Sequence, residues 1–445
     1  MNHRHAILAV LLLSFLVVGC LEEPPANTTQ TPSPLSGQAT GSGLVKLPTS
    51  LTVPSPTVAP TAAPTTTTSA TATPAASSTP VATATPKATT APKGKAATAI
   101  ACGLVSSNLV LAGDVIMPSS DDACLVVAKD GVTIDCGGRV LSPVLAGTGT
   151  GVFVNGYKNV VVKNCALQRF AVGIKFSNAE NAFATGNTVS DFSAGTGVLA
   201  LASKGVNVSG NTITITEGST PTAVGINVTD SAGAEISGNT IESGLTGVFA
   251  DRTANIVVNG NSVRKAVSGL LVFHSDNAKI TANTIKQSSF AAFALPASGI
   301  SASGSTTTIQ RNVVEGQKNA IECDGVNSVI EDNKALSSER GIYSAGANTE
   351  IRRNDASFNN LGIIVNGASS IVDSNSAWGN REGGIVLQSP SNTVSNNVAC
   401  SNTNADINAK IVPQVGTNTN KCQANRCYPS DAAMCNPSGG CLQTC

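Results

Sequence analysis

Short apolar segments separated by turn residues repeat along the chain from about residue 100 onward. Each segment reads small residue, apolar, variable, then apolar or small, as in Gly225–Val228 and Gly362–Val365. An asparagine recurs in step with these segments. The pattern predicts three strands of three to five residues per repeat, separated by Gly, Asn and Ser turns. The recurring asparagines are Asn164, Asn187, Asn211, Asn239, Asn261, Asn283, Asn312, Asn333, Asn354, Asn375 and Asn397.

A repeat of this length indicates a solenoid. A leucine-rich repeat needs a leucine scaffold and room for a helix, and the repeat has neither. In a parallel β-helix each strand pairs with its equivalent one coil away, at a spacing of ~4.8 Å. Alternation then turns the apolar positions inward and the variable position outward. The sequence therefore predicts an all-β, right-handed parallel β-helix of about twelve coils with three short strands per coil.

From about Ile100 to Ile411 the repeat resembles the pectate-lyase-like parallel β-helix superfamily, and Asp130–Gly138 is similar to its entry coil. The resemblance implies the fold, whereas unrelated activities share this scaffold. Enzymes of the group use carboxylates that project outward from neighbouring coils. Among the outward positions of the strand that begins with the small residue, only Glu322 is acidic, so we expect no carboxylate pair for glycoside hydrolysis there. The Gly-His-Gly motif of polygalacturonases and the Asp-Pro-His-Asp motif of alginate epimerases are also missing.

The chain begins with an apolar run, Ala6–Gly19, that follows a short polar segment and ends at Cys20. The run is too short to span a bilayer and has the layout of a cleaved signal peptide. Its end resembles a lipobox, which implies a lipid group on Cys20. We therefore predict a signal peptide (1–19), a disordered Thr/Pro/Ala/Ser-rich stalk (20–98), the β-helix (99–412) and a Cys-rich cap (413–445). The location expected is extracytoplasmic, on the cell surface, with the membrane contacted through the lipid alone.

Cysteines cluster at both ends of the repeat, where a solenoid exposes its core and needs caps. An exported chain favours disulfides over metal binding, and no histidine beyond His274 accompanies them, so no metal site is expected. Cys136 and Cys165 occupy the same place in adjacent coils, which permits a bridge. Cys323 takes an inward position and is predicted to be a buried free thiol. The predicted disulfide cysteines are Cys102, Cys124, Cys136, Cys165, Cys400, Cys422, Cys427, Cys435, Cys441 and Cys445.

One charged constellation interrupts the repeat. Five residues after the strand glycine, three consecutive coils carry Asp230, Arg252 and His274, whereas later coils carry glycine. Longer connections after Asn211 and Asn283 bracket these coils and predict the walls of a groove. The weak catalytic candidates are Asp230, Arg252, His274, Asp251 and Asp276, and the ligand-binding candidates beside them are Asn227, Phe249 and Leu271. The alternative is an ion ladder that only stabilises a turn.

Composition narrows the function classes. The 27 basic and 27 acidic residues give zero net charge, which argues against nucleic acid and anionic membrane surfaces as partners. We predict a surface β-helix that binds polysaccharide or another envelope polymer. One alternative is a polysaccharide lyase or hydrolase, the only case in which Ca²⁺ would serve as a cofactor. Another is a structural or adhesive module that oligomerises through the outward apolar run Tyr343, Ile364 and Val386. Three methionines and so few histidines give copper delivery little support.

Overall fold

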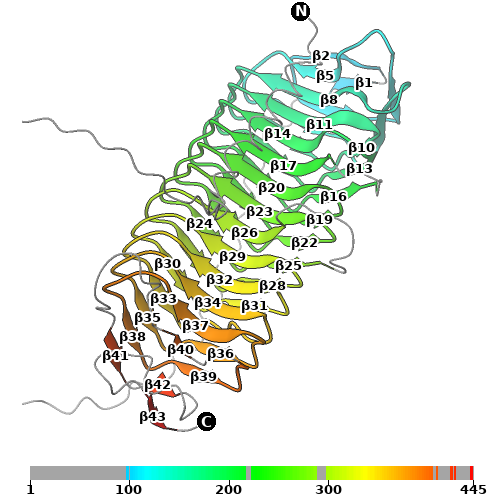
Figure 1. The fold of residues 1–445 in the computed structure, drawn as a ribbon. Helices are drawn as coiled ribbons and strands as arrows, with labels where there is room; N and C mark the ends of the chain where they lie inside the picture. Colours follow the sequence, from blue (N-terminus) through cyan, green and yellow to red (C-terminus); the bar gives the residue numbers. More distant parts are fainter. Residues whose placement is uncertain are drawn as a thin grey trace, which may run out of the picture. The chain divides into compact units, whose positions relative to one another are not determined.

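The computed structural model describes residues 101–216, 222–287 and 297–403, together with the backbone of a few short strands outside these ranges. The predictions for the signal peptide, for Cys20 and for most of the stalk and the C-terminal cap lie outside the described residues. Within them the chain winds into successive coils of parallel strands (Figure 1). No described residue is helical, and the described part of the chain contains no helix fit to cross a membrane.

Three long parallel sheets build this solenoid, and most coils contribute one strand to each of them. A fourth sheet of four strands, which includes β36 (Ser376–Trp378) and β39 (Val398–Cys400), follows the shortest of the three towards the end of the chain. We call the 15-stranded sheet A, the 14-stranded sheet B and the 10-stranded sheet C. One coil passes through β18 (Glu235–Ser237) of sheet A, β19 (Thr240–Glu242) of sheet C and β20 (Thr246–Asp251) of sheet B. The predicted fold is confirmed, and the strand numbers in sheets A and B are close to the twelve coils expected.

The strands of sheet B are the longest, at five to eight residues over most of the solenoid. In stacking order they are β2 (Gly103–Val105), β5 (Ala123–Val127), β8 (Thr148–Asn155), β11 (Phe170–Ser177), β14 (Thr196–Leu201), β17 (Val224–Thr229), β20, β23 (Ser268–Phe273), β26 (Ser298–Ala302), β29 (Asn319–Cys323), β32 (Arg340–Ser344), β34 (Leu361–Val365), β37 (Gly383–Leu387) and β40 (Ile407–Asn408).

The core is built from columns of aliphatic side chains. One inward column of sheet B stacks Ile321, Ile342 and Ile363 as direct partners on β29, β32 and β34. The same column reaches back to Ile226 and Ile174. All five side chains are fully buried. The register predicted from the repeat is therefore confirmed.

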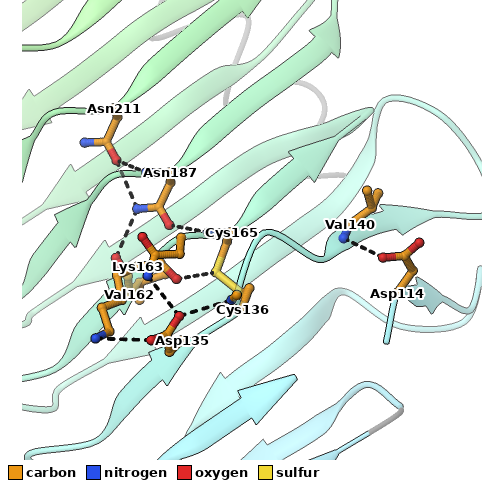
Figure 2. Close-up of a disulfide and its surroundings, with 11 residues drawn as sticks. Asp114, Asp135, Cys136, Val140, Val162, Lys163, Cys165, Asn187 and Asn211 are labelled. Carbon is orange, nitrogen blue, oxygen red and sulfur yellow. Dashed lines mark hydrogen bonds and ion pairs between the residues drawn. A yellow bond between two sulfur atoms is a disulfide. The ribbon is translucent and has the colours of Figure 1, made fainter. Parts of the chain in front are cut away.

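A ladder of buried asparagines follows the corner between sheets A and C. Asn187 donates from its backbone N and its Nδ2 to Oδ1 of Asn211, at 2.9 and 3.0 Å (Figure 2). The left-handed residue at this corner is the one before the asparagine, such as Gly186. The ladder therefore starts at Asn187, and Cys165 rather than Asn164 occupies the rung below it. The sequence repeat places this first asparagine one residue too early.

Two disulfides lie in the first coils. Cys102 is bonded to Cys124, and Cys136 to Cys165, whose Cα atoms are 4.6 Å apart (Figure 2). Cys400 is disulfide-bonded as well. Cys323 is free and fully buried, as its inward position predicts. The disulfide predictions for Cys422, Cys427, Cys435, Cys441 and Cys445 lie outside the described residues.

Candidate functional site

Arg252 links two carboxylates at the corner that follows the strands of sheet B. Its Nε donates to Oδ1 of Asp230 at 2.7 Å and its Nη2 to Oδ2 at 3.2 Å. Its Nη1 donates to the carboxylate of Asp251. Nδ1 of His274 lies 2.8 Å from the other oxygen of Asp251. Four of the five catalytic candidates thus form one network over three coils, which we call the charged ladder.

Asp276 stands apart from the charged ladder. One of its carboxylate oxygens accepts hydrogen bonds from the backbone N and the Oγ of Ser305, both at 2.8 Å. These hydrogen bonds lower the pKa of Asp276. The side chain therefore fixes the turn of the following coil.

The backbone explains why the charged residues stack. Asp230, Arg252 and His274 all adopt left-handed φ values, of 52°, 51° and 48°. This conformation costs a residue with a Cβ about 1–2 kcal/mol relative to the right-handed one. The three corners are thus equivalent, and in-register strands place the side chains one coil apart.

The prediction that later coils carry a glycine at the position of Asp230, Arg252 and His274 is wrong. Leu270 to Lys279 spans nine positions, whereas Ile300 to Thr308, their partners in the next coil, spans eight. The corner therefore loses one residue at this coil. Gly346 packs so closely there that an added Cβ would lie 2.0 Å from the carbonyl oxygen of Gly325. Close packing explains Gly325, Gly346 and Gly367, whereas Gly304 also has a positive φ, of 133°.

The charged ladder keeps polar surface available. The Arg252 and His274 side chains are 55% and 64% exposed, whereas that of Asp251 is 15% exposed. The hydrogen bond from Arg252 lowers the pKa of the Asp230 carboxyl group. The carboxylates of Asp230 and Asp251 are therefore held by Arg252 and His274, while the outer edges of the guanidinium and the imidazole remain open to solvent. Such a surface can bind hydroxyl or carboxylate oxygens.

The three ligand-binding candidates form one row on the outward face of sheet B. Asn227, Phe249 and Leu271 are direct partners on β17, β20 and β23, and all three are half-buried. The ring of Phe249 contacts Phe273 edge to face, with centroids 6.2 Å apart. The row therefore presents an amide, a ring and an aliphatic side chain side by side, and the charged ladder follows at the end of the same strands.

The two long connections do not flank the charged ladder. They fall between β16 (Thr212–Ile215) and β17, and between β25 (Thr284–Lys286) and β26. Both therefore join sheet C to the start of a sheet B strand, whereas the charged ladder follows the end of these strands. Most of their residues lie outside the described ranges. The predicted groove, with the charged ladder as its floor between the two connections, is wrong in this respect.

A carboxyl pair that the sequence reasoning missed lies further along sheet B. Oε2 of Glu322 accepts hydrogen bonds from Oγ of Ser298 at 3.0 Å and from Nδ2 of Asn319 at 3.2 Å. Asp324 follows two residues later, just after the end of β29 (Asn319–Cys323). It is exposed, but partial desolvation of its carboxyl group and the charge of Glu322 raise its pKa to about 6. One outward position per coil was considered from the sequence. The position two residues after it also faces outward, and it would have revealed Asp324.

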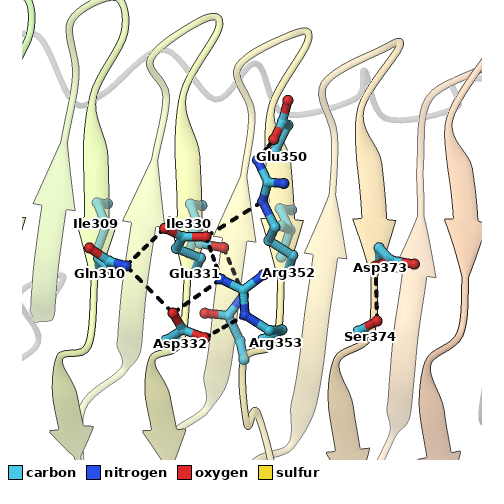
Figure 3. A network of polar contacts seen from close by, with 12 residues as sticks. Ile309, Gln310, Ile330, Glu331, Asp332, Glu350, Arg352, Arg353, Asp373 and Ser374 are labelled. Atoms are coloured by element: carbon cyan, nitrogen blue, oxygen red, sulfur yellow. Dashed lines mark hydrogen bonds and ion pairs between the residues drawn. The ribbon is translucent and has the colours of Figure 1, made fainter. Parts of the chain in front are cut away.

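Sheet A carries a second charged network, at β30 (Val329–Glu331) and β33 (Glu350–Arg352). Arg353 donates to Oδ1 of Asp332 and to Oε2 of Glu331, both at 2.7 Å, and Arg352 pairs with Glu350 (Figure 3). A shallow pocket borders Asp332 and Arg353. Each arginine here has a carboxylate partner, which is typical of an ion network that fixes neighbouring coils.

Two family models match consecutive parts of the chain. Residues 118–295 match the family described as periplasmic copper-binding protein (NosD), and residues 298–439 match the right-handed β-helix region. The chain belongs to the right-handed parallel β-helix superfamily. No curated protein matches this β-helix protein.

Several solved structures resemble this β-helix protein at low identity. A periplasmic alginate epimerase, AlgG, is 12% identical with a TM-score of 0.45, covering 71% of this chain and 84% of that chain. DFA-IIIase from Arthrobacter chlorophenolicus A6, without its lid, is 12% identical with a TM-score of 0.42, covering 64% and 82%. A tailspike mutant of E. coli bacteriophage HK620, in complex with a pentasaccharide, is 10% identical with a TM-score of 0.41, covering 66% and 64%.

The described residues of this β-helix protein do not supply a donor set for a copper centre. Within the described ranges no group of three or more His, Cys, Asp or Glu side chains could hold a metal ion. Met117 and Cys323 are fully buried in the apolar core. Nδ1 of His274 is already engaged by Asp251. The copper binding in the name of the matched family therefore finds no support among the described residues.

Proposed function

We propose that this chain is a lipid-anchored, extracytoplasmic β-helix protein that binds a polysaccharide on the outward face of sheet B. The observation that carries the proposal is the row Asn227, Phe249 and Leu271 next to the charged ladder. An aromatic ring offers an apolar surface to the C–H face of a sugar, and neighbouring polar groups bind its hydroxyls. The combination of a ring, an aliphatic contact and exposed donors on adjacent coils suits such a ligand.

The repeat itself favours a polymer over a small ligand. Equivalent side chains recur once per coil, at a spacing of ~4.8 Å along the solenoid axis. A chain of sugars that lies along this axis therefore meets one row of side chains per coil. Arg252 and His274 would bind hydroxyl or carboxylate groups at the edge of that chain.

The location rests on the beginning of the chain. The apolar run that ends at Cys20 supports export and lipid attachment, and the disulfides of the first coils suit an oxidising compartment. The matched family is described as periplasmic, which is consistent with this assignment.

The structural or adhesive alternative loses its main argument. It needs the outward run Tyr343, Ile364 and Val386 to form a continuous apolar patch. Ile364 is only 3% exposed, and it lies between the other two in the register. The run is therefore interrupted at its centre, and an oligomer built on this patch is not favoured.

Affinity electrophoresis of the full chain in gels that contain one soluble polysaccharide each tests the proposal. Polygalacturonate, alginate, xylan and dextran serve as probes. We expect retardation by at least one of them, and Phe249→Ala should weaken it about 2- to 10-fold, the loss of one aromatic contact of ~0.5–1.5 kcal/mol. Phe183→Ala, which removes an exposed ring from β12 (Phe183–Thr185) of sheet A, is the matched control. Equal retardation of both variants, or none of the wild type, would contradict the proposal.

A further inference from the structure

We infer that the outward surface where sheet C gives way to the four-stranded sheet is a second carbohydrate site, which binds a neutral sugar unit. It lies on another sheet than the row of the proposed function and does not depend on it. The chain's single tryptophan, Trp378, lies in this surface on β36, and Phe358 lies on the preceding coil. Their side chains are 45% and 57% exposed, and the ring centroids are 5.1 Å apart in an edge-to-face arrangement.

This aromatic pair departs from the pattern of sheet C. The outward positions of its middle strands carry hydroxyl or charged side chains, which suit a solvated sheet face. On β16, β19 and β22 (Ser262–Arg264) they are Thr212, Thr214, Thr240, Glu242, Ser262 and Arg264. Two exposed rings in contact are therefore an exception to the local composition, and rings of this kind supply large, rigid contact surfaces to ligands.

The backbone holds Phe358 in a strained conformation. Its φ is 60°, in the left-handed region, where a bulky side chain is an outlier. The equivalent corners of the adjacent coils carry the small residues Ser337 and Gly379, with φ values of 51° and 65°. A Cβ added to Gly379 would lie 3.2 Å from Cδ1 of Phe358, so this glycine leaves room for the ring. Strain of this kind is concentrated at functional sites, because packing alone gives no reason to keep it.

Hydrogen bonds connect the aromatic pair to a carboxylate beside it. The backbone N of Trp378 donates to Oγ of Ser357 at 3.2 Å, and this hydroxyl donates to Oδ1 of Asp355. Ser357 is only 4% exposed, so a buried donor fixes the Asp355 side chain. Oδ2 of Asp355 accepts no hydrogen bond within the described ranges. The carboxylate is thus held through one oxygen, while the other is left to accept from a ligand.

The carboxylate lies where sheet C is interrupted. β31 (Lys334–Leu336) is the last strand of sheet C, and β36 begins the four-stranded sheet two coils later (Figure 1). The coil between them contributes only Asp355, as an isolated bridge to Lys334 on one side and to Ser376 on the other. These three residues line a shallow pocket of about 340 Å³, which is at the lower end of the range of ligand pockets.

The charges of the pocket favour a neutral ligand. It is bordered by two acidic side chains, Asp332 and Asp355, and by two basic ones, Arg353 and Lys334. A ligand with a net charge therefore gains little from the pocket as a whole.

A sugar unit matches both parts of the site. Its hydroxyls donate and accept, so they can bind the Asp355 carboxylate, the Lys334 ammonium and the Ser376 hydroxyl. Its C–H face can pack on the aromatic pair. Ser376 and Trp378 are two positions apart on β36, ~6.6 Å along the strand, which one sugar unit can span.

Tryptophan fluorescence tests the inference directly, because Trp378 is the only tryptophan in the chain. The full chain is titrated with maltohexaose, cellohexaose, xylohexaose and mannohexaose, and with trigalacturonate as an acidic probe. At least one neutral probe should change the emission in a saturable way, and more tightly than trigalacturonate. Phe358→Gly and Lys334→Ala should each weaken this binding about 2- to 12-fold, the effect of one aromatic contact or one hydrogen bond. The thermal midpoint of Phe358→Gly should stay within ~4 °C of the wild type, because glycine adopts this φ without strain.

The matched controls are Phe183→Ala and Lys279→Ala, which remove an exposed ring and an exposed ammonium from sheet A and should leave the titration unchanged. Absence of a saturable change with every neutral probe would overturn the inference, and so would wild-type binding in both Phe358→Gly and Lys334→Ala. Tighter binding of trigalacturonate would overturn the assignment to a neutral sugar. A response lost in Phe249→Ala would place the sugar on sheet B and also overturn the second site. A response at Trp378 without retardation in the gels would support the second site and count against the proposed binding row alone.

Discussion

Replacing one rung of the asparagine ladder should destabilise the solenoid far more than a surface change. Asn261→Ala removes the acceptor that Asn239 uses through its backbone N and its Nδ2, at 3.0 and 2.9 Å. It also removes the donor to Oδ1 of Asn283 and to the carbonyls of Ile236 and Asn259, at 3.0, 2.9 and 3.2 Å. The backbone N of Asn239 would lose its partner at this buried corner, whereas its Nδ2 keeps the bond to Val208.

The magnitude follows from these contacts. A buried donor without a partner costs about 1–3 kcal/mol, and each of the four other lost hydrogen bonds costs about 0.5–1.5 kcal/mol. The free energy of unfolding should therefore fall by about 3–9 kcal/mol, a large part of the ~5–15 kcal/mol of a typical domain. This loss would be smaller if the corner relaxed around the substituted residue.

Urea unfolding of the full chain gives the change in free energy, and hydrogen exchange locates it. Because each coil contacts only its neighbours, amides of β18 to β25 should lose protection before those of distant coils. Asn259→Ala is the matched control, since Asn259 is exposed and its Oδ1 accepts a surface hydrogen bond from Oγ1 of Thr281. It should cost less than ~0.5 kcal/mol. A similar loss in both variants would refute the reasoning about the ladder.

Three further outcomes are expected. Ile342→Asp places an unpaired charge in the inward column and should prevent folding, measured as loss of the cooperative thermal transition. Cys20→Ser should release the protein from the membrane fraction or leave the precursor uncleaved, because a diacyl anchor holds where a single chain does not. The pKa of Asp230 is lower in the folded state, so its contribution to stability is present above pH ~4 and is lost as pH falls further. The stability difference between Asp230→Asn and the wild type should therefore shrink on acidification in urea titrations, and a difference independent of pH would contradict the pairing with Arg252.

Most of the fold was predictable because the repeat encodes it directly. Inward residues such as Ile321 and Ile363 recur at the coil length, and a one-residue slip would turn the whole column outward. The first rung of the asparagine ladder was misplaced because Asn164 and Asn187 look alike in sequence. Only the hydrogen bonds distinguish the left-handed residue from the buried one.

The candidate site was predictable only in part. An equal offset from the strand glycine brought Asp230 and Arg252 together, because the coils concerned have the same length. The same offset failed beyond His274, where the corner is one residue shorter. Asp324 was missed because only one outward row was considered, and its raised pKa depends on desolvation that no sequence pattern reports.

The shortened corner also marks the start of a run of coils of equal length. Val248 and Leu270 are 22 residues apart, whereas Ile300, Ile321, Ile342 and Ile363 follow one another at 21. The change falls where the match to one family model ends and the next begins. Within the 21-residue stretch a whole coil could be duplicated or excised with the strand register preserved, as slices of equal thickness are added to or taken from a stack. A unit moved across the boundary would bring a corner with one residue too many or too few, so the 21-residue stretch can lengthen by whole coils of its own kind.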